Sequence, residues 1–359
     1  MNTTLFKTTA IITLTSNFLI AASCSGGACG VAIRPPVPSD LQENIKLKPF
    51  AAFNAKQIKK GYDGWIIVDN GGDTDIGENR FMAGIDVNSL LEDNDKVSLF
   101  GLISDENLKS GKVSYAYPLP WKDLTVEASY TQTNYTLGEN AQGSTGIGTI
   151  RSVEGKMTYP IINSDKEKLK FSLSLSNNNI DEEITNDSFV ANSWKSSYSA
   201  TASIDFETKK YSIFNLDTNQ ELSLGLNSGK LTFDNINDEK ADEVTLNTQG
   251  SYTKINIDYK NNISTSENTS IVSTFRGQYA LNNKNLDDSE SLSIGGMNGV
   301  KIYEESVTYG STGFFTNIEG KYKLPVFNEI KNSIGAFMTM DRFGLLNLPV
   351  NIQKFKILI

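Results

Sequence analysis

Histidine is absent from the 359-residue chain, and cysteine occurs only twice. The lack of histidine removes the commonest general base and metal ligand, and with it any Ser-His-Asp triad. No pair of carboxylates has a spacing that defines an acid–base site. The sequence therefore predicts that the protein is not an enzyme and holds neither a metal nor a cofactor.

The chain also has no excess of basic residues. It contains 33 Lys and Arg against 42 Asp and Glu, which gives a net charge of −9. Phosphate backbones bind clustered cations, so nucleic acid is not an expected partner. Outside the N-terminus no run of about 18 apolar residues could form a spanning helix. A transmembrane β-barrel would show the same moderate hydropathy, since half of each strand faces water.

The N-terminus has the pattern of a secretory signal. Residues 1–23 carry Lys7 near their start, continue through an apolar stretch and end in small residues. A buried helix is the alternative. Cys24 follows at once and is a candidate for lipidation, although Cys24 and Cys29 could also form a disulfide or lie in an unconstrained stretch.

Residues 24–64 are predicted to be a periplasmic linker. Their Pro35, Pro36 and Pro38 exclude a helix or a central strand there. The segment is too short for a separate domain with its own core. We therefore expect the main domain to span residues 65–359.

From Trp65 onward the chain alternates apolar and polar residues. In residues 169–176, Leu or Phe occupies every odd position and Lys or Ser every even one. About 13 such segments lie between Trp65 and Leu345, each close to the ~9–11 residues of a membrane-crossing strand. Residues 177–193 and 234–243 are predicted outer loops, and residues 118–121 and 160–163 predicted inner turns.

This pattern predicts an all-β protein, an antiparallel transmembrane β-barrel in the bacterial outer membrane, surrounded by lipid. A soluble β-sandwich or a surface fibre is the alternative, because its strands alternate too. Sandwich strands are usually about 5–6 residues long. The longer period here, together with the secretory signal, favours the barrel.

The start of the predicted barrel resembles a known family. Asp69, Asn70, Gly72, Gly77 and Arg80 have the spacing Asp-Asn-x-Gly, four residues, Gly-x-x-Arg. This is similar to the opening of the barrel in two-partner secretion transporters of the ShlB/FhaC/HecB haemolysin secretion/activation family, which share a BamA-like architecture. Further matches follow in the family's order: Ser114-Tyr115 with Pro118, Tyr159-Pro160, Gly277-Gln278 and Leu286-x-x-Ser289-Glu290.

A glycine-rich segment carries the most distinctive match. Gly295 and Gly296 precede Val300-Lys301-Ile302-Tyr303, which resembles the family's Val-Arg-Gly-Tyr hook. The resemblance implies that this hook lies at the tip of a long loop folded into the lumen. It also implies that the cation meets an acidic residue on the barrel wall, for which Asp341 is the candidate. By residue pattern alone, an ordinary hairpin loop with a surface lysine is the alternative.

The resemblance implies an outer-membrane pore that exports a large partner exoprotein, a haemolysin or adhesin, without ATP. Three departures from the family stand out. Lys301 replaces Arg and lacks its bidentate fork, no complete receptor (POTRA) domain precedes the barrel, and about 13 of an expected 16 strands are present. We therefore expect a barrel incomplete at its C-terminus. A truncated non-secreting remnant and a passive porin-like barrel are the alternatives.

Overall fold

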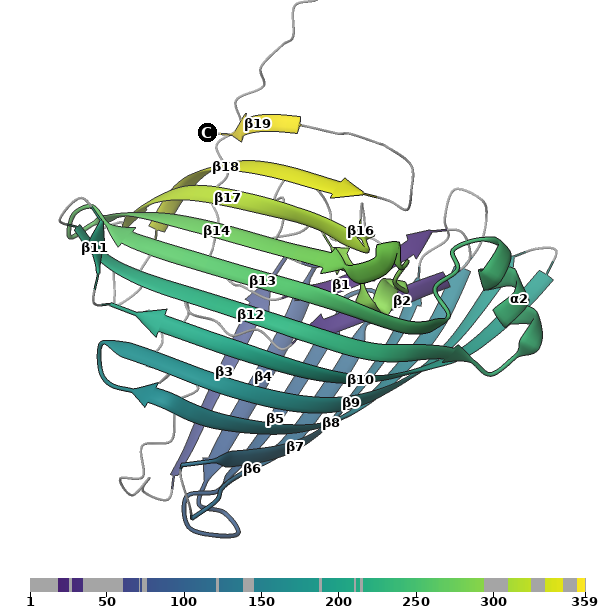
Figure 1. Cartoon of the computed structure of the whole chain (residues 1–359), viewed down its shortest axis with the longest axis horizontal. Helices are drawn as coiled ribbons and strands as arrows, with labels where there is room; N and C mark the ends of the chain where they lie inside the picture. Colours follow the sequence, from purple (N-terminus) through teal and green to yellow (C-terminus); the bar gives the residue numbers. More distant parts are fainter. Residues whose placement is uncertain are drawn as a thin grey trace, which may run out of the picture.

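The computed structural model describes most of the predicted barrel. Described are residues 19–25, 28–34, 61–70, 72, 76–120, 123–137, 145–186, 189–209, 211–213, 216–293, 309–323, 333–344 and 354–358. Within them, one curved antiparallel sheet follows the order of the chain (Figure 1).

Strands of the sheet pair with their neighbours in sequence. Their bounds are β3 Gly61–Asp69, β4 Arg80–Asn88, β5 Lys96–Ser104, β6 Lys109–Pro118, β7 Thr125–Leu137, β8 Thr145–Asn163, β9 Glu167–Asn186, β10 Phe189–Thr208, β11 Ser212–Ile213, β12 Leu216–Phe233, β13 Gly250–Ser264, β14 Thr269–Ala280, β17 Thr312–Lys323, β18 Ser333–Gly344 and β19 Lys354–Leu358. The two-residue β11 pairs only with β12. The prediction of an antiparallel sheet of about 13 crossing strands is confirmed by the path from β3 to β18.

The two faces of the sheet have the polarity of a barrel in lipid. In β9, Leu175 is 62% exposed, whereas the neighbouring face carries Ser172 at 3%. Phe171 and Leu173 share the exposed side. A sandwich would bury the apolar face and expose the polar one. The reversed arrangement places the apolar face in hydrocarbon and the polar face around the lumen.

Several strands are longer than a membrane requires. β9 and β10 have 20 residues each, against the ~9–11 that cross a bilayer. The prediction of an outer loop over residues 177–193 is wrong, because the β9–β10 ladder continues from Asn177 to the Asn186–Phe189 pair. Beyond the bilayer, water lies on both faces of these two strands, so their polar side chains are solvated. The hydrogen bonds of the β9–β10 ladder satisfy the backbone N–H and C=O groups.

The connections differ in length on the two sides of the sheet. Residues 164–166 form a short turn in which the Ser164 amide donates to the Glu167 carbonyl at 2.9 Å. The predicted turn at 160–163 is instead the end of β8, with a register shift after Pro160, a position that a strand allows to proline.

On the opposite side, residues 234–249 form a long connection that includes the predicted outer loop over residues 234–243 and contains α2 (Ile236–Val244). Outer-membrane barrels have short periplasmic turns and longer extracellular loops, so the side of α2 is extracellular. No helix in the described part of the chain is long and apolar enough to cross a membrane.

A short hairpin precedes the sheet. β1 (Leu19–Ser25) pairs with β2 (Ala28–Arg34), and their backbone register sets Cys24 opposite Cys29. This hairpin spans the end of the predicted signal and the start of the predicted linker. The first strand of the large sheet begins at Gly61 rather than at Trp65.

Candidate functional site

After β14, residues 281–293 turn back towards the inner face of the sheet (Figure 1). It forms the short helices η1 (Leu281–Asn283) and η2 (Asp288–Glu290), then β15 (Leu292–Ser293). β15 pairs with β16 (Tyr309–Gly310), which leads into β17. We call residues 281–293 the loop base. The β15–β16 ladder therefore fixes both ends of residues 294–308, which carry the predicted hook.

The first attachment of the loop base centres on Lys195 of β10. Its Nζ lies 2.9 Å from the Asp287 Oδ2 of the loop base and 3.2 Å from the Glu182 Oε2 of β9. The Lys195 side chain is fully buried. The Tyr135 hydroxyl donates to the Glu182 Oε1 at 2.7 Å. One cation on the wall thus joins a wall carboxylate to a loop carboxylate.

The second attachment centres on Lys254 of β13. Its Nζ lies 2.7 Å from the Glu290 Oε2 and donates to the Glu290 backbone carbonyl at 2.6 Å. Ser197 donates to the Glu290 Oε1 at 3.3 Å, and the Gln278 Nε2 donates to the Glu290 carbonyl at 3.2 Å. Four side-chain bonds from three strands therefore meet on one loop residue.

Two tyrosines reach these attachments by lying over glycines. Tyr135 is opposite Gly148 in the β7–β8 ladder, and a Cβ on Gly148 would collide with the tyrosine ring. Tyr252 lies over Gly229 in the same way. Because glycine has no side chain, each tyrosine ring can lie flat along the inner wall, as aromatic residues do over glycine in designed sheets. Tyr135 then bonds Glu182.

Electrostatics favour a charged carboxylate at Asp287. Burial alone would raise the pKa of Asp287, but the charge of Lys195 and the hydrogen bonds from Ser289 outweigh it and hold that pKa below its usual range. Asp287 also caps η2 by accepting from the Ser289 amide at 3.1 Å. Removing one partner of a buried ion pair costs roughly 3–5 kcal/mol, so these pairs hold the loop base firmly.

The outer edge of the loop base is tied to the α2 connection. The Lys284 Nζ donates to the carbonyls of Asn247 and Gln249 at 2.8 and 2.7 Å. The Asn285 Nδ2 donates to the Leu246 carbonyl. Two extracellular connections therefore support each other.

The predicted barrel-start motif forms a second, compact site between β3 and β4. The Arg80 Nε lies 2.8 Å from the Asp69 Oδ1, and both side chains are buried. The Gly72 amide donates to the Glu78 carbonyl at 2.9 Å, and Gly77 has a φ of 108°, a conformation that favours glycine. The structure brings Asp69, Gly72, Gly77 and Arg80 together.

The fifth motif residue, Asn70, is exposed. The hook residues Gly295, Gly296, Val300, Lys301 and Tyr303 lie outside the described residues. Asp341 lies in β18, where its backbone pairs with Phe315 of β17 and Lys354 of β19. The pairing of Lys301 with Asp341 stays a prediction, as does lipidation of Cys24. Among the described residues, no group of three or more potential ligands could hold a metal.

Sequence reasoning missed the lysines that hold the loop base. Lys195 and Lys254 occur in alternating strands, where a polar residue predicts only a lumen-facing position. Glu290 was part of a recognised motif, but the motif did not say what the carboxylate binds. Asp287 lies 92 residues from Lys195 in sequence, so no local pattern could join them.

A sheet with an apolar outer face and a polar inner face, with a loop attached to that inner face, is the architecture of an outer-membrane β-barrel. Solved structures with this fold include CdiB from Escherichia coli, with a TM-score of 0.62 and 14% identity over 91% of this chain and 56% of that one. CdiB from Acinetobacter baumannii matches with a TM-score of 0.56 and 17% identity over 82% and 51%. BamA from Haemophilus ducreyi matches with a TM-score of 0.53 and 10% identity over 80% and 58%.

The chain belongs to the haemolysin secretion/activation protein family ShlB/FhaC/HecB, whose family model matches residues 54–341. Curated relatives include the heme/hemopexin transporter protein HuxB of Haemophilus influenzae strain 86-028NP, 23% identical over 88% of this chain and 55% of the relative. HuxB of strain KW20 is 22% identical over 75% and 46%. The chain spans about half the length of these relatives. The predicted family and the predicted outer-membrane location are confirmed.

Proposed function

We propose that the protein is the outer-membrane pore of a two-partner secretion system and exports one large exoprotein of the haemolysin or adhesin type. Family membership supports this activity. The observation that carries the proposal is the attachment of the loop base to the inner wall through Lys195–Asp287 and Lys254–Glu290. A loop held in this way favours a gated pore over a permanently open one.

In this proposal the loop base stays attached to the wall, and the Lys301–Asp341 pair is the contact that opens. The two ion pairs hold residues 281–293 against the wall. Residues 294–308 connect β15 to β16 and carry Lys301, which pairs with Asp341 while the pore is closed. A lysine forms this contact through a point charge rather than a bidentate fork. The hook is therefore released more easily than the base when a chain enters the lumen.

The N-terminal part of the proposal follows the sequence. Residues 1–23 act as a signal peptide that directs the chain to the periplasm. The residues that follow, up to the start of β3, act as a linker. The chain from Gly61 onward supplies the barrel, and the exported partner is recognised by surfaces on the periplasmic side.

The test is co-expression with a candidate exoprotein, followed by its assay in the medium and in the periplasm. Cargo classes to try are haemolysins, adhesins and, because the relatives are named heme/hemopexin transporters, exoproteins that acquire haem. Export that depends on this chain supports the proposal. A chain that inserts and conducts ions but exports none of these cargoes is a passive barrel. A chain that fails to insert is a non-secreting remnant.

The hook is tested separately by single-channel recording. Lys301→Ala and Asp341→Ala should each raise the frequency of large openings and make residues 294–308 more sensitive to protease. The double variant should add little, because both changes remove the same contact. Glu267→Gln, in the exposed β13–β14 turn, is the matched control. Wild-type conductance and protease resistance in both single variants would end the hook hypothesis.

A further inference from the structure

A groove crosses the outer face of β4, β5 and β6. The strand register aligns Ala83, Gly101 and Gly111 in one row. A Cβ on Gly101 would meet no atom within 4 Å, and one on Gly111 would meet only the Phe100 carbonyl oxygen at 3.9 Å. This row of small residues forms the floor of a groove with a volume of about 650 Å³.

The walls of the groove are apolar and exposed. Phe81 and Ile103 form one wall, and the row that contains Leu99, Val113 and Tyr130 forms the other. Leu99 is 49% exposed and Ile103 is 52% exposed. Such a surface favours hydrocarbon over water at roughly 25 cal/mol per Å².

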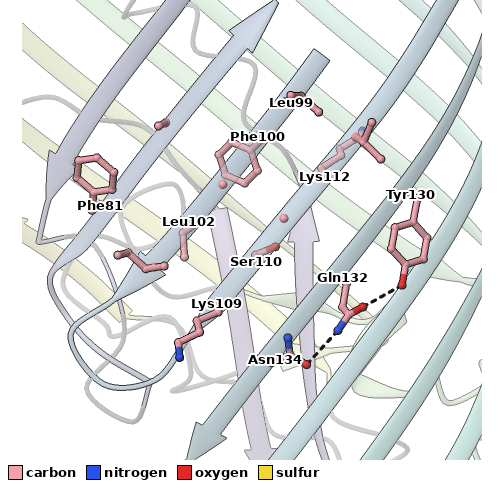
Figure 2. Close-up of a pocket in the computed structure, with 15 residues that line it drawn as sticks. Phe81, Leu99, Phe100, Leu102, Lys109, Ser110, Lys112, Tyr130, Gln132 and Asn134 are labelled. Atoms are coloured by element: carbon pink, nitrogen blue, oxygen red, sulfur yellow. Dashed lines mark hydrogen bonds between the residues drawn. The ribbon is translucent and has the colours of Figure 1, made fainter. Parts of the chain in front are cut away.

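One end of the groove is polar. In the strand register, Lys109 is opposite Asn134 (Figure 2), and Arg151 is opposite Gln132. The Tyr130 hydroxyl donates to the Gln132 Oε1 at 3.0 Å, and the Gln132 Nε2 donates to the Asn134 Oδ1 at 3.4 Å. Because both amide oxygens accept within the group, the amide N–H groups of Asn134 remain as donors between two cations.

The polar end lies at the extracellular level of the membrane. Lys109 is the first residue of β6 and follows the β5–β6 connection, on the same side as α2. Arg151 makes an ion pair with Asp181 at 2.5 Å that is about 40% exposed, as expected for side chains in the headgroup region. The wall formed by Phe81 and Ile103 lies in the same row as Lys109, and the wall formed by Leu99, Val113 and Tyr130 lies further along the strands towards the bilayer centre.

We propose that this groove binds one phosphate-bearing lipid of the outer leaflet. An acyl chain lies over Ala83, Gly101 and Gly111, and a headgroup phosphate lies between Lys109 and Arg151. Charge complementarity carries the choice, because a chain of net charge −9 places Lys109, the amide donors of Asn134 and the guanidinium of Arg151, which Asp181 only partly neutralises, beside an apolar channel. Charge-assisted hydrogen bonds to phosphate are about twice as strong as neutral ones. The site is independent of the secretion proposal.

The test is native mass spectrometry of the full chain in detergent, with added lipid A that carries two phosphates. We expect one retained lipid on the unmodified protein. The double variant Lys109→Gln/Arg151→Gln should weaken retention about tenfold, and Gly101→Leu should do so by filling the groove. Lys166→Gln, in an exposed turn on the opposite side, and Gly155→Leu, at an open outer glycine of β8, are the matched controls.

Three results would overturn the proposal. Dephosphorylated lipid A retained as well as the phosphorylated form would mean that apolar contact alone acts. Unchanged retention in the double lysine–arginine variant would remove the phosphate site. Equal losses in Gly101→Leu and Gly155→Leu would remove the groove. Each variant is first checked for the heat-dependent gel mobility of a folded barrel, and Gly111→Leu replaces Gly101→Leu if the latter fails.

Discussion

Lys195→Met should release the loop base from the wall. The Lys195 Nζ is fully buried and lies 2.9 Å from Asp287 and 3.2 Å from Glu182. Without the lysine, the carboxylates of Glu182 and Asp287 are buried near each other with no cation between them. Breaking a buried ion pair costs roughly 3–5 kcal/mol. If the free energy of opening the loop base falls by about 3 kcal/mol, the lower end of this range, the open state should become roughly 100-fold more populated.

Amide hydrogen exchange of the loop base measures this change. The Glu290 amide donates to the Asp287 carbonyl at 2.8 Å, so its exchange reports opening of η2. Lys168→Met is the matched control, since its 3.4 Å pair with Glu207 is partly exposed and is worth about 0–1 kcal/mol. The control should therefore leave exchange of the loop base unchanged.

A double-mutant cycle separates the two partners of Lys195. Asp287→Asn keeps the Lys195–Glu182 pair and should cost about 2 kcal/mol, the value of a charge-assisted hydrogen bond. Combined with Lys195→Met it should be strongly non-additive. Additive effects, or exchange in Lys195→Met that matches the unmodified protein, would refute the assignment of Lys195 as the anchor.

Two further predictions concern the loop base and the inner face of the barrel. The folded-state pKa of Asp287 lies below its ordinary value, so its ionised form stabilises the docked loop above about pH 3.8. That contribution is lost as the pH falls below this value and through the folded-state pKa. Channel recordings from pH 6 downward should therefore show a loss of gating only below about pH 3.8, and Asp287→Asn should remove this pH dependence. Gly148→Val should displace the Tyr135 ring and cost roughly 1–3 kcal/mol, measured as a lower urea midpoint. Gly155→Val, where the added carbons enter open space, should cost less.

The strands were predictable because their signal is local. Residues 169–176 alternate strictly, and the structure exposes their apolar side while burying Ser172. The same rule failed over residues 177–193, where polar residues on both faces hide the alternation. There the ladder itself, rather than side-chain polarity, extends the strand.

The candidate site was only half predictable. Asp69 and Arg80 are close in sequence, so their motif indicated a unit that the structure brings together. The loop anchors join Lys254 to Glu290 across 36 residues, and Lys195 to Asp287 across 92. Such contacts depend on the path of the whole sheet, which no short pattern contains.

The tyrosine-over-glycine pairs also constrain how the sequence can change over evolution. While Tyr135 remains, every residue other than glycine at position 148 collides with its ring. Once the tyrosine is lost, Glu182 loses its hydroxyl donor and the glycine loses its purpose. The two positions, on neighbouring strands, should therefore change together, and the same holds for Tyr252 and Gly229. Divergent copies of this barrel should keep or exchange both members of each pair together.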